Sequence, residues 1–134
     1  MKYKQLLFLE KEKAQEANLG YLFNFYRPIR FNRFKLKYIS QNNYNMKIYI
    51  HCPELADKSI NQNLDGVGRP TDIVGLINTA NQNNEENKHT LFLNKESVFE
   101  KLSFYFTDKD GNRVNMNSYD FTIILDVEKS TEIF

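Results

Sequence analysis

The sequence contains a single cysteine, Cys52, and no tryptophan. Because one thiol cannot form a disulfide within the chain, a disulfide-stapled secreted scaffold is excluded, and a reducing compartment suits the protein. The hallmark of antibody-type domains, a buried tryptophan packed against a cysteine pair, is missing as well. These absences exclude the disulfide-stapled class and remove the usual sequence mark of an antibody domain.

A large excess of charge is also missing, since 18 Lys and Arg residues are balanced by 17 Asp and Glu residues, giving a formal net charge of +1. This balance removes the bulk electrostatic field expected of a protein whose main partner is a nucleic-acid backbone or an anionic membrane. The longest apolar run near the N-terminus is Leu6 to Leu9, far below the roughly 20 residues of a membrane span. We therefore expect neither membrane insertion nor secretion by a signal peptide.

The composition that remains is that of one globular domain. A chain of 134 residues can bury one core and is too short for two, and its 41% hydrophobic and 26% charged residues are typical of globular proteins. We divide it into an N-terminal arm or short helix over residues 1–20 and a single jelly-roll β-sandwich domain over residues 21–134.

Alternation of apolar and polar residues is the most regular signal. Every second residue is apolar from Phe34 to Tyr38, and again from Met46 to Ile50. This period of two places the apolar residues on one face of a strand. Because asparagines between these segments favour a turn, residues 33–51 are predicted to form a hairpin around Gln41 to Asn45.

The C-terminal third shows the same pattern. An alternating strand from Leu102 to Phe106 leads into an Asp-Gly turn, which supplies the left-handed conformation that a tight hairpin needs. A return strand from Arg113 to Met116 and a last strand from Phe121 to Val127 complete a predicted antiparallel meander. The residues assigned to the structural turn are Asp108, Asp110 and Gly111.

Helix signals are few. Good helix formers from Leu9 to Asn18 predict a short helix or an ordered arm, and Pro70 to Ile77 reads as a short helix after a capping segment. The polar residues from Gln82 to Lys88 are expected to form an exposed loop. The fold class that follows is mostly β, an antiparallel β-sandwich with one or two short helices, with jelly-roll and immunoglobulin-like topologies as candidates.

Calcium chemistry is the first function to test against the residues. Asp108, Asp110 and Asn112 offer alternate acidic oxygens, but Gly111 comes fourth, whereas the helix-loop-helix calcium loop has its glycine sixth and a glutamate twelfth. A plain hairpin turn is the favoured interpretation.

Other catalytic and cofactor patterns fail in similar ways. Gly66 to Gly68 lacks the third glycine and the Gly-Lys-Ser/Thr ending of a phosphate loop. His51 and Cys52 are neighbours in an extended strand, so their side chains point to opposite faces, and nothing orients His89 toward the thiol. No spacing indicates a metal site, and no local motif marks a pair of glycosidase carboxylates. We expect no enzymatic activity, no cofactor and no metal.

One charged segment interleaves cations with aromatic residues between Tyr26 and Tyr38. Such alternation is used by single-stranded nucleic-acid grooves, where cations follow phosphates and rings stack on bases. The favoured interpretation is simpler: the rings face the core, and the cations face outward toward acidic groups of a neighbouring subunit. The cations of this predicted interface are Arg27, Arg30, Arg33, Lys35 and Lys37.

The order of the segments "IYIHCPEL", "PTDIVGLI", "TLFL" and "FEKLSFYFTDKDGNRVNMNSYDFTIILDVE" resembles the small single jelly-roll capsid proteins of virophages, polinton-like viruses and related large DNA viruses, including their penton and minor capsid proteins. Their late block runs from a strand through Asp-x-x-Gly to a second strand, a polar break, an aromatic residue and a last strand. The matching residues here are Asp108, Gly111, Asn115 and Phe121.

The resemblance implies a virion structural protein, made in the host cytoplasm and located in the capsid as a minor capsid, penton or cement subunit. Its partners would be copies of itself and other capsid subunits. Two alternatives stay open. One is a nucleic-acid-binding β domain that uses the strand from Arg27 to Lys37. The other is a carbohydrate- or receptor-binding jelly roll in which Tyr44, Tyr49 or Tyr119 stacks on a sugar.

Overall fold

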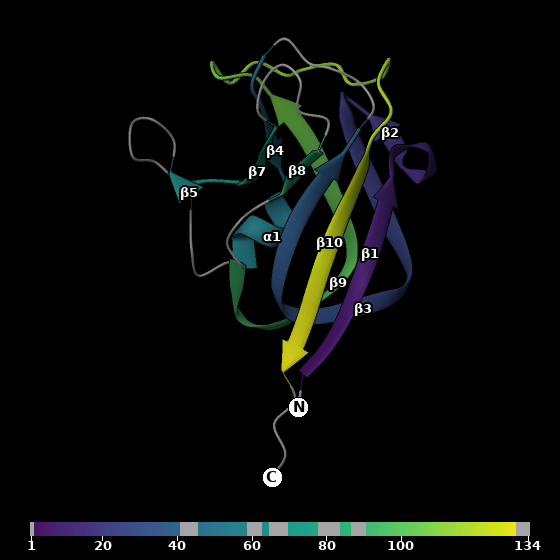
Figure 1. Cartoon of the computed structure of the whole chain (residues 1–134), viewed down its shortest axis with the longest axis vertical. Helices are drawn as coiled ribbons and strands as arrows, with labels where there is room; N and C mark the ends of the chain where they lie inside the picture. The colour runs from purple at the N-terminus through teal and green to yellow at the C-terminus, as the bar shows by residue number, and fades with distance from the viewer. Residues whose placement is uncertain are drawn as a thin grey trace.

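The computed structural model describes residues 2–40, 46–58, 63–64, 70–77, 84–86 and 91–130. Within these ranges the chain is mostly antiparallel β structure (Figure 1), so the mostly-β prediction is confirmed. One short α-helix, α1 (Pro53–Lys58), and one 3-10 helix, η1 (Lys11–Lys13), accompany the strands there. The strands are β1 (Lys2–Glu10), β2 (Gln15–Ala17), β3 (Gly20–Ile39), β4 (Ile48–His51), β5 (Asn63–Leu64), β6 (Pro70–Thr71), β7 (Ile73–Ile77), β8 (Asn84–Glu86), β9 (Leu91–Thr107) and β10 (Thr122–Ser130). No helix among the described residues is long and apolar enough to cross a membrane.

The two longest strands, β3 and β9, are neighbours in the middle of the main sheet. The order of the sheet is β1-β10-β3-β9-β4-β7, with β2 and β8 also paired to β3, while β5 and β6 pair with each other. The ladder between β3 and β9 shifts register between Asn24 and Ile29 and again between Phe31 and Arg33. Because such irregularities bend a strand and increase its twist, the sheet curls on itself (Figure 1).

The curl brings the two halves of the sheet face to face. One half contains β1, β10 and the end of β3, and the other contains the start of β3, the end of β9, β4 and β7. Tyr38 from the first half meets Phe106 from the second, with ring centroids 6.3 Å apart. At the far edge, a methyl group placed on Gly75 would lie 3.1 Å from the Leu36 side chain. A side chain at this position would therefore require Leu36, or Ile50 at 3.2 Å, to shift by a few tenths of an ångström, because β7 packs closely on these residues. The jelly-roll connectivity itself stays a prediction.

The core is built from the alternating residues of these strands. Phe106 lies in its middle and contacts the rings of Tyr21, Tyr38 and Phe121. Edge-to-face contacts of this kind add to the free energy gained by burying the rings. The predicted inward faces of β9 and β10 are confirmed, because the alternate residues from Leu102 to Phe106 and from Ile123 to Val127 are buried.

Both predicted helices are wrong. The segment from Leu9 to Asn18 forms the end of β1, η1 and β2. Differences in helix propensity between residue types are only about a few tenths of a kcal/mol per residue, so strand pairing with β10 and β3 outweighs them. The segment from Pro70 to Ile77 forms β6 and β7, and the β-branched residues of β7 pair with β4. The helix that does form, α1, begins at Pro53, a residue suited to a first helical position.

Several predicted connections are also wrong, although their strands exist. The segments 34–38 and 48–50 are strands, but β3 pairs with β10 and β9, whereas β4 pairs with β9 and β7. The turn expected between them, Gln41 to Asn45, lies outside the described residues. β9 and β10 do not form a meander, since β3 lies between them, and the predicted return strand is a single bridge between Thr107 and Arg113. β8 lies inside the predicted loop 82–88.

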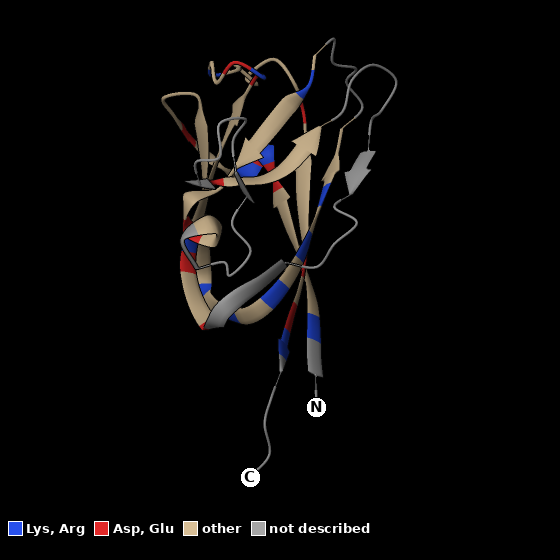
Figure 2. Ribbon diagram, turned by 90° about the vertical axis from the view of Figure 1, so that its left-hand side faces the viewer, with Lys and Arg blue, Asp and Glu red and all other residues tan. Residues whose placement is uncertain are grey.

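The N-terminal segment is part of the domain and not a separate arm. β1 pairs with β10 along its whole length, from Lys2 opposite Ser130 to Glu10 opposite Thr122. Figures 1 and 2 show these two terminal strands side by side, extending toward the marked ends of the chain. The division at residue 20 is therefore replaced by one sheet that includes β1.

Candidate functional site

A polar cluster lies where β4 and β9 end and β7 begins. His51 is the last residue of β4, Thr107 is the last residue of β9, and Asp72 directly precedes β7. β4 lies between the other two strands, with His51 opposite Tyr105 on one side and Ile73 on the other. The Cys52 backbone N–H donates to the Asp72 carbonyl oxygen at 2.9 Å, which holds the start of β7 against β4.

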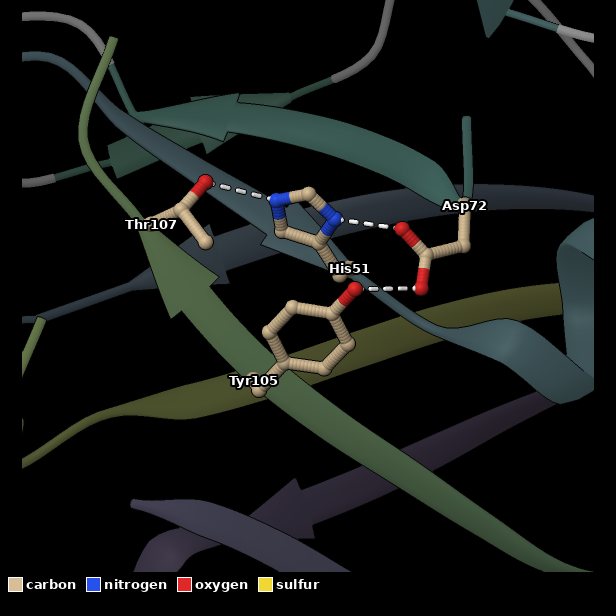
Figure 3. A network of polar contacts seen from close by, with 4 residues as sticks. All are labelled: His51, Asp72, Tyr105 and Thr107. Carbon is tan, nitrogen blue, oxygen red and sulfur yellow. Dashed lines mark hydrogen bonds and ion pairs between the residues drawn. The ribbon is translucent and has the colours of Figure 1, made fainter. Parts of the chain in front are cut away.

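Hydrogen bonds join four side chains of this cluster (Figure 3). His51 Nδ1 lies 2.5 Å from Asp72 Oδ1, and His51 Nε2 lies 2.7 Å from Thr107 Oγ1. The Tyr105 hydroxyl donates to the other carboxylate oxygen of Asp72 at 2.6 Å. A neutral imidazole protonated on Nδ1 satisfies both of its contacts, because it donates to the carboxylate and accepts from the threonine hydroxyl.

Ring stacking reinforces the same cluster. The His51 and Tyr105 rings are nearly parallel, with an interplanar angle of 12° and centroids 4.4 Å apart. The Arg113 guanidinium carbon lies 3.8 Å from the centroid of the Tyr105 ring, within the range of a cation–π contact. Tyr105 therefore connects the imidazole, the carboxylate and a cation from the turn that follows β9.

The environment shifts the pKa values of two of these groups. Burial raises the pKa of Tyr105 to about 12, and the hydrogen bond to the Asp72 carboxylate and its charge act in the same direction. Burial by itself raises the pKa of Asp72, but the hydrogen bonds from Tyr105 and His51 outweigh it and place that pKa below its ordinary value of 3.8. At neutral pH the cluster therefore holds an ionised Asp72 beside a neutral Tyr105.

The order carboxylate, imidazole, hydroxyl is that of a hydrolytic triad. In such a triad the hydroxyl must reach a substrate, whereas Thr107 is only 6% exposed and its bond to His51 is buried. The grooves beside Lys4 and beside Glu10 are lined by other residues. We therefore interpret the cluster as a structural hydrogen-bond network that holds together the ends of β4 and β9 and the start of β7.

Cys52 is also enclosed. It is fully buried, and burial raises the pKa of its thiol well above the usual value, which disfavours the nucleophilic thiolate. Its Sγ contacts the Glu54 carboxylate at 3.5 Å. Glu54 also accepts hydrogen bonds from the backbone N–H and the hydroxyl of Ser103, so it joins α1 to β9. His89 and Gly66 to Gly68 lie outside the described residues.

The turn after β9 is built as expected. Asp108 Oδ1 accepts from the backbone N–H groups of Asp110 and Asn112, both at 2.9 Å, and the bond from Asn112 makes the largest contribution to a lowered pKa of Asp108. Gly111 has a φ of +85°, the left-handed conformation predicted for it. The described residues contain no group of three or more His, Cys, Asp or Glu side chains that could hold a metal ion.

The structure separates the five predicted interface cations. Arg27, Arg30 and Lys35 are exposed, whereas Arg33 and Lys37 are half-buried. Arg33 is paired with Glu128 of the neighbouring strand at 3.3 Å, and Arg30 contacts Glu96 at 3.4 Å. Sequence reasoning did not anticipate these partners, because they lie about 66 and 95 positions away along the chain.

Most aromatic residues between Tyr26 and Tyr38 are buried in the core. Phe31, Phe34 and Tyr38 are buried, as the favoured interpretation required, while Tyr26 is 98% exposed. The tyrosines proposed for sugar stacking are less available than expected. Tyr49 is half-buried and Tyr119 packs against the core, while Tyr44 lies outside the described residues.

Two grooves of opposite charge lie near the two ends of β1. We call one the basic groove, which has a volume of about 690 Å³ and draws its cations from β1, β3 and β10. We call the other the acidic groove, which also includes Lys11, whose Nζ donates to the carbonyl oxygens of Asn117 and Tyr119. The cations of the basic groove are Lys4, Arg27, Arg30 and Lys129. The carboxylates of the acidic groove are Glu10, Glu12 and Asp120.

Comparisons with known proteins add no family to this picture. No protein-family model matches the chain, and no curated protein matches it.

Proposed function

We propose that this chain is a non-enzymatic structural subunit of a virion, which acts by assembling with copies of itself and with other capsid subunits. The observation that carries the proposal is the surface of β1. Leu6 and Phe8 are 53% and 58% exposed on the same face of this strand, whereas the alternate residues Leu7 and Leu9 are buried. Large apolar side chains gathered on one strand indicate a surface that another protein covers.

The polar cluster supports the same proposal from inside the molecule. His51, Asp72 and Thr107 are tied to one another across three strand ends, and the hydroxyl that would have to react is buried. Such a network stabilises a fixed arrangement of strands, which is what a subunit needs to present the same surface in every copy.

The proposal also follows the resemblance to single jelly-roll capsid proteins. The late block that carries the resemblance contains β9, the turn at Asp108 to Gly111 and β10. The turn and the first and last strands of the block form, with the aromatic Phe121 buried just before β10, whereas the second strand of the block is only the bridge between Thr107 and Arg113. A minor capsid, penton or cement role would place the protein in the virion.

The structure changes which cations are expected to face a neighbour. Arg33 is half-buried and forms a salt bridge with Glu128, so reversing its charge would disturb the fold as well as an interface. Arg27 and Lys4 are exposed and both line the basic groove. An acidic group of a neighbouring subunit is therefore expected at these two residues.

The test is the mass of the full-length protein in solution. Sedimentation velocity across a wide range of concentrations, with negative-stain electron microscopy of the same samples, should show closed symmetric oligomers or particles. A monomer at every concentration would overturn the proposal.

The basic groove favours one second function, the binding of single-stranded nucleic acid. Its four cations could follow a phosphate backbone. The exposed Tyr26 directly precedes Arg27 in the sequence and could stack on a base. Fluorescence anisotropy with a labelled single strand would measure this. Tight binding that falls steeply with salt, and that Arg27→Glu removes, would support nucleic-acid binding over assembly.

A further inference from the structure

β1 is an open edge of the main sheet. It ends the strand order and pairs with β10 alone among the described strands. The Lys11 N–H donates to the Phe121 carbonyl oxygen, which continues the register between β1 and β10. Because hydrogen-bonding direction alternates along a strand, odd-numbered residues of β1 bond to β10 and even-numbered residues point their N–H and C=O groups to the open side. These even-numbered residues include Lys4, Leu6, Phe8 and Glu10.

The side chains of these even-numbered residues form a self-complementary row. A cation begins the row, two exposed apolar side chains form its middle, and an anion ends it. If a second β1 pairs antiparallel with Leu7 opposite Leu7, Leu6 lies opposite Phe8 and Lys4 lies opposite Glu10, each twice. A register shifted to place Leu6 opposite Leu6 would instead set Lys4 against Phe8. The first register is therefore favoured, since opposite charges and apolar side chains stabilise cross-strand pairs.

The two grooves favour the same antiparallel direction. The basic groove includes Lys4 near the start of β1, and the acidic groove includes Glu10 at its end. An antiparallel arrangement brings the basic groove of one copy beside the acidic groove of the other, and does so at both ends of the contact. A parallel arrangement would place like charges together, which is unfavourable.

We propose that a second copy of this chain binds at the β1 edge, through antiparallel pairing of β1 with β1 in the register that sets Leu7 on the two-fold axis. The two main sheets then become one continuous sheet, and the contact closes because each copy uses its only β1 edge. The proposal rests on the proposed function, because it names the first contact of the assembly.

Disulfide trapping tests the register directly. Leu6→Cys and Phe8→Cys proteins are mixed and oxidised mildly, because residues in a hydrogen-bonded antiparallel pair lie about 5.5 Å apart between Cα atoms, a separation suited to a disulfide. Random cross-linking of an equimolar mixture gives about twice as much mixed dimer as either homodimer, so we expect the mixed disulfide dimer to exceed this statistical ratio clearly. A mixed dimer at the statistical ratio would count against the register. The wild-type protein is the control, since its Cys52 is fully buried and should give no cross-linked product. A dominant Leu6→Cys homodimer, or no cross-link at all, would overturn this register.

Exchanging the charges of Lys4 and Glu10 tests whether these side chains form ion pairs between two copies of the chain. Lys4→Glu alone should raise the dimer dissociation constant about tenfold, because both charge pairs become repulsive. Lys4→Glu combined with Glu10→Lys should restore the dissociation constant to within about threefold of wild type. If Lys4 only stabilised the folded monomer, the second substitution would not restore the dimer dissociation constant. Thermal melting of each variant shows whether it is still folded.

The outcomes separate this proposal from the proposed function. If the protein assembles but neither the cross-links nor the charge exchange respond, assembly uses another surface and the β1 contact is wrong. If the wild-type protein is a monomer at every concentration, both proposals fail. If Lys4→Glu weakens the dimer and the double variant does not recover, the pairing of Lys4 with Glu10 is refuted.

Discussion

Replacing Tyr105 with phenylalanine removes one hydroxyl group and leaves the ring in place. The stacking on His51 and the contact with Arg113 therefore persist, while Asp72 Oδ2 loses its donor at 2.6 Å. Hydrogen bonds to charged groups contribute about 1.5–3 kcal/mol to stability. The Asp72 side chain is 25% exposed, so water can partly replace the lost hydroxyl. We therefore expect the free energy of unfolding to fall by about 1.5 kcal/mol, the low end of this range.

Thermal and urea unfolding followed by circular dichroism would measure this change. For a chain of this length the expected loss corresponds to a Tm lower by about 5 °C. The matched control is Tyr26→Phe, which removes the same group from a side chain that is 98% exposed and should change stability by less than about 0.5 kcal/mol. Equal effects of the two variants would refute the role assigned to the Tyr105 hydroxyl.

The pH dependence of the same pair of proteins provides a second check. The pKa of Asp72 lies below its ordinary value of 3.8 in the folded protein, so its ionisation contributes stability that is present above about pH 4 and is lost as pH falls through the folded pKa. The difference between wild type and Tyr105→Phe should therefore be full at pH 7 and smaller at pH 3. It should also narrow above pH 10, because the unfolded tyrosine ionises there while folded Tyr105 holds its proton to about pH 12. A difference independent of pH would contradict this account.

Three further variants test other parts of the fold. Gly111→Val should lower stability by about 1 kcal/mol or more in thermal melts, because an added Cβ meets no neighbour but the backbone has a φ of +85°. Arg33→Glu should lower the Tm, since it sets a second carboxylate against Glu128, whereas the exposed Arg27→Glu should leave the Tm unchanged. Lys11→Met should cost about 1–3 kcal/mol in urea unfolding, because two backbone carbonyls of the turn before β10 lose their donor.

The positions of β9 and β10 could be predicted from the sequence, whereas their partner strands could not. The alternation from Leu102 to Phe106 and from Phe121 to Val127 is local, and both segments are strands with the expected buried face. Pairing depends on residues far apart in the chain: β3 lies between these two strands, and its partners in β10 come 83 to 95 positions later, from Thr122 opposite Ile39 to Glu128 opposite Arg33. The expectation that successive strands are neighbours is a tendency, and here the long, bent β3 and β9 override it.

The failed helices have a related cause. The residues before Asn18 are good helix formers in isolation, yet β1 contributes Leu7 and Leu9 to the core only as a strand beside β10. A helix there would leave the β10 edge without the partner strand that β1 provides. Local propensity is a weak preference, and the burial of these side chains outweighs it.

The polar cluster shows the limit of local reasoning most clearly. The sequence prediction placed His51 and Cys52 on opposite faces of one strand, whereas β4 ends at His51 and Cys52 lies just beyond it. The sequence offered no partner for the imidazole. The available signal was polar side chains at alternate positions, Tyr105 and Thr107, on the face opposite the buried phenylalanines of β9. Only the order β9-β4-β7 brings them beside His51 and Asp72, and in a mostly-β chain that order is set by long-range pairing, which leaves no trace in the local period of two.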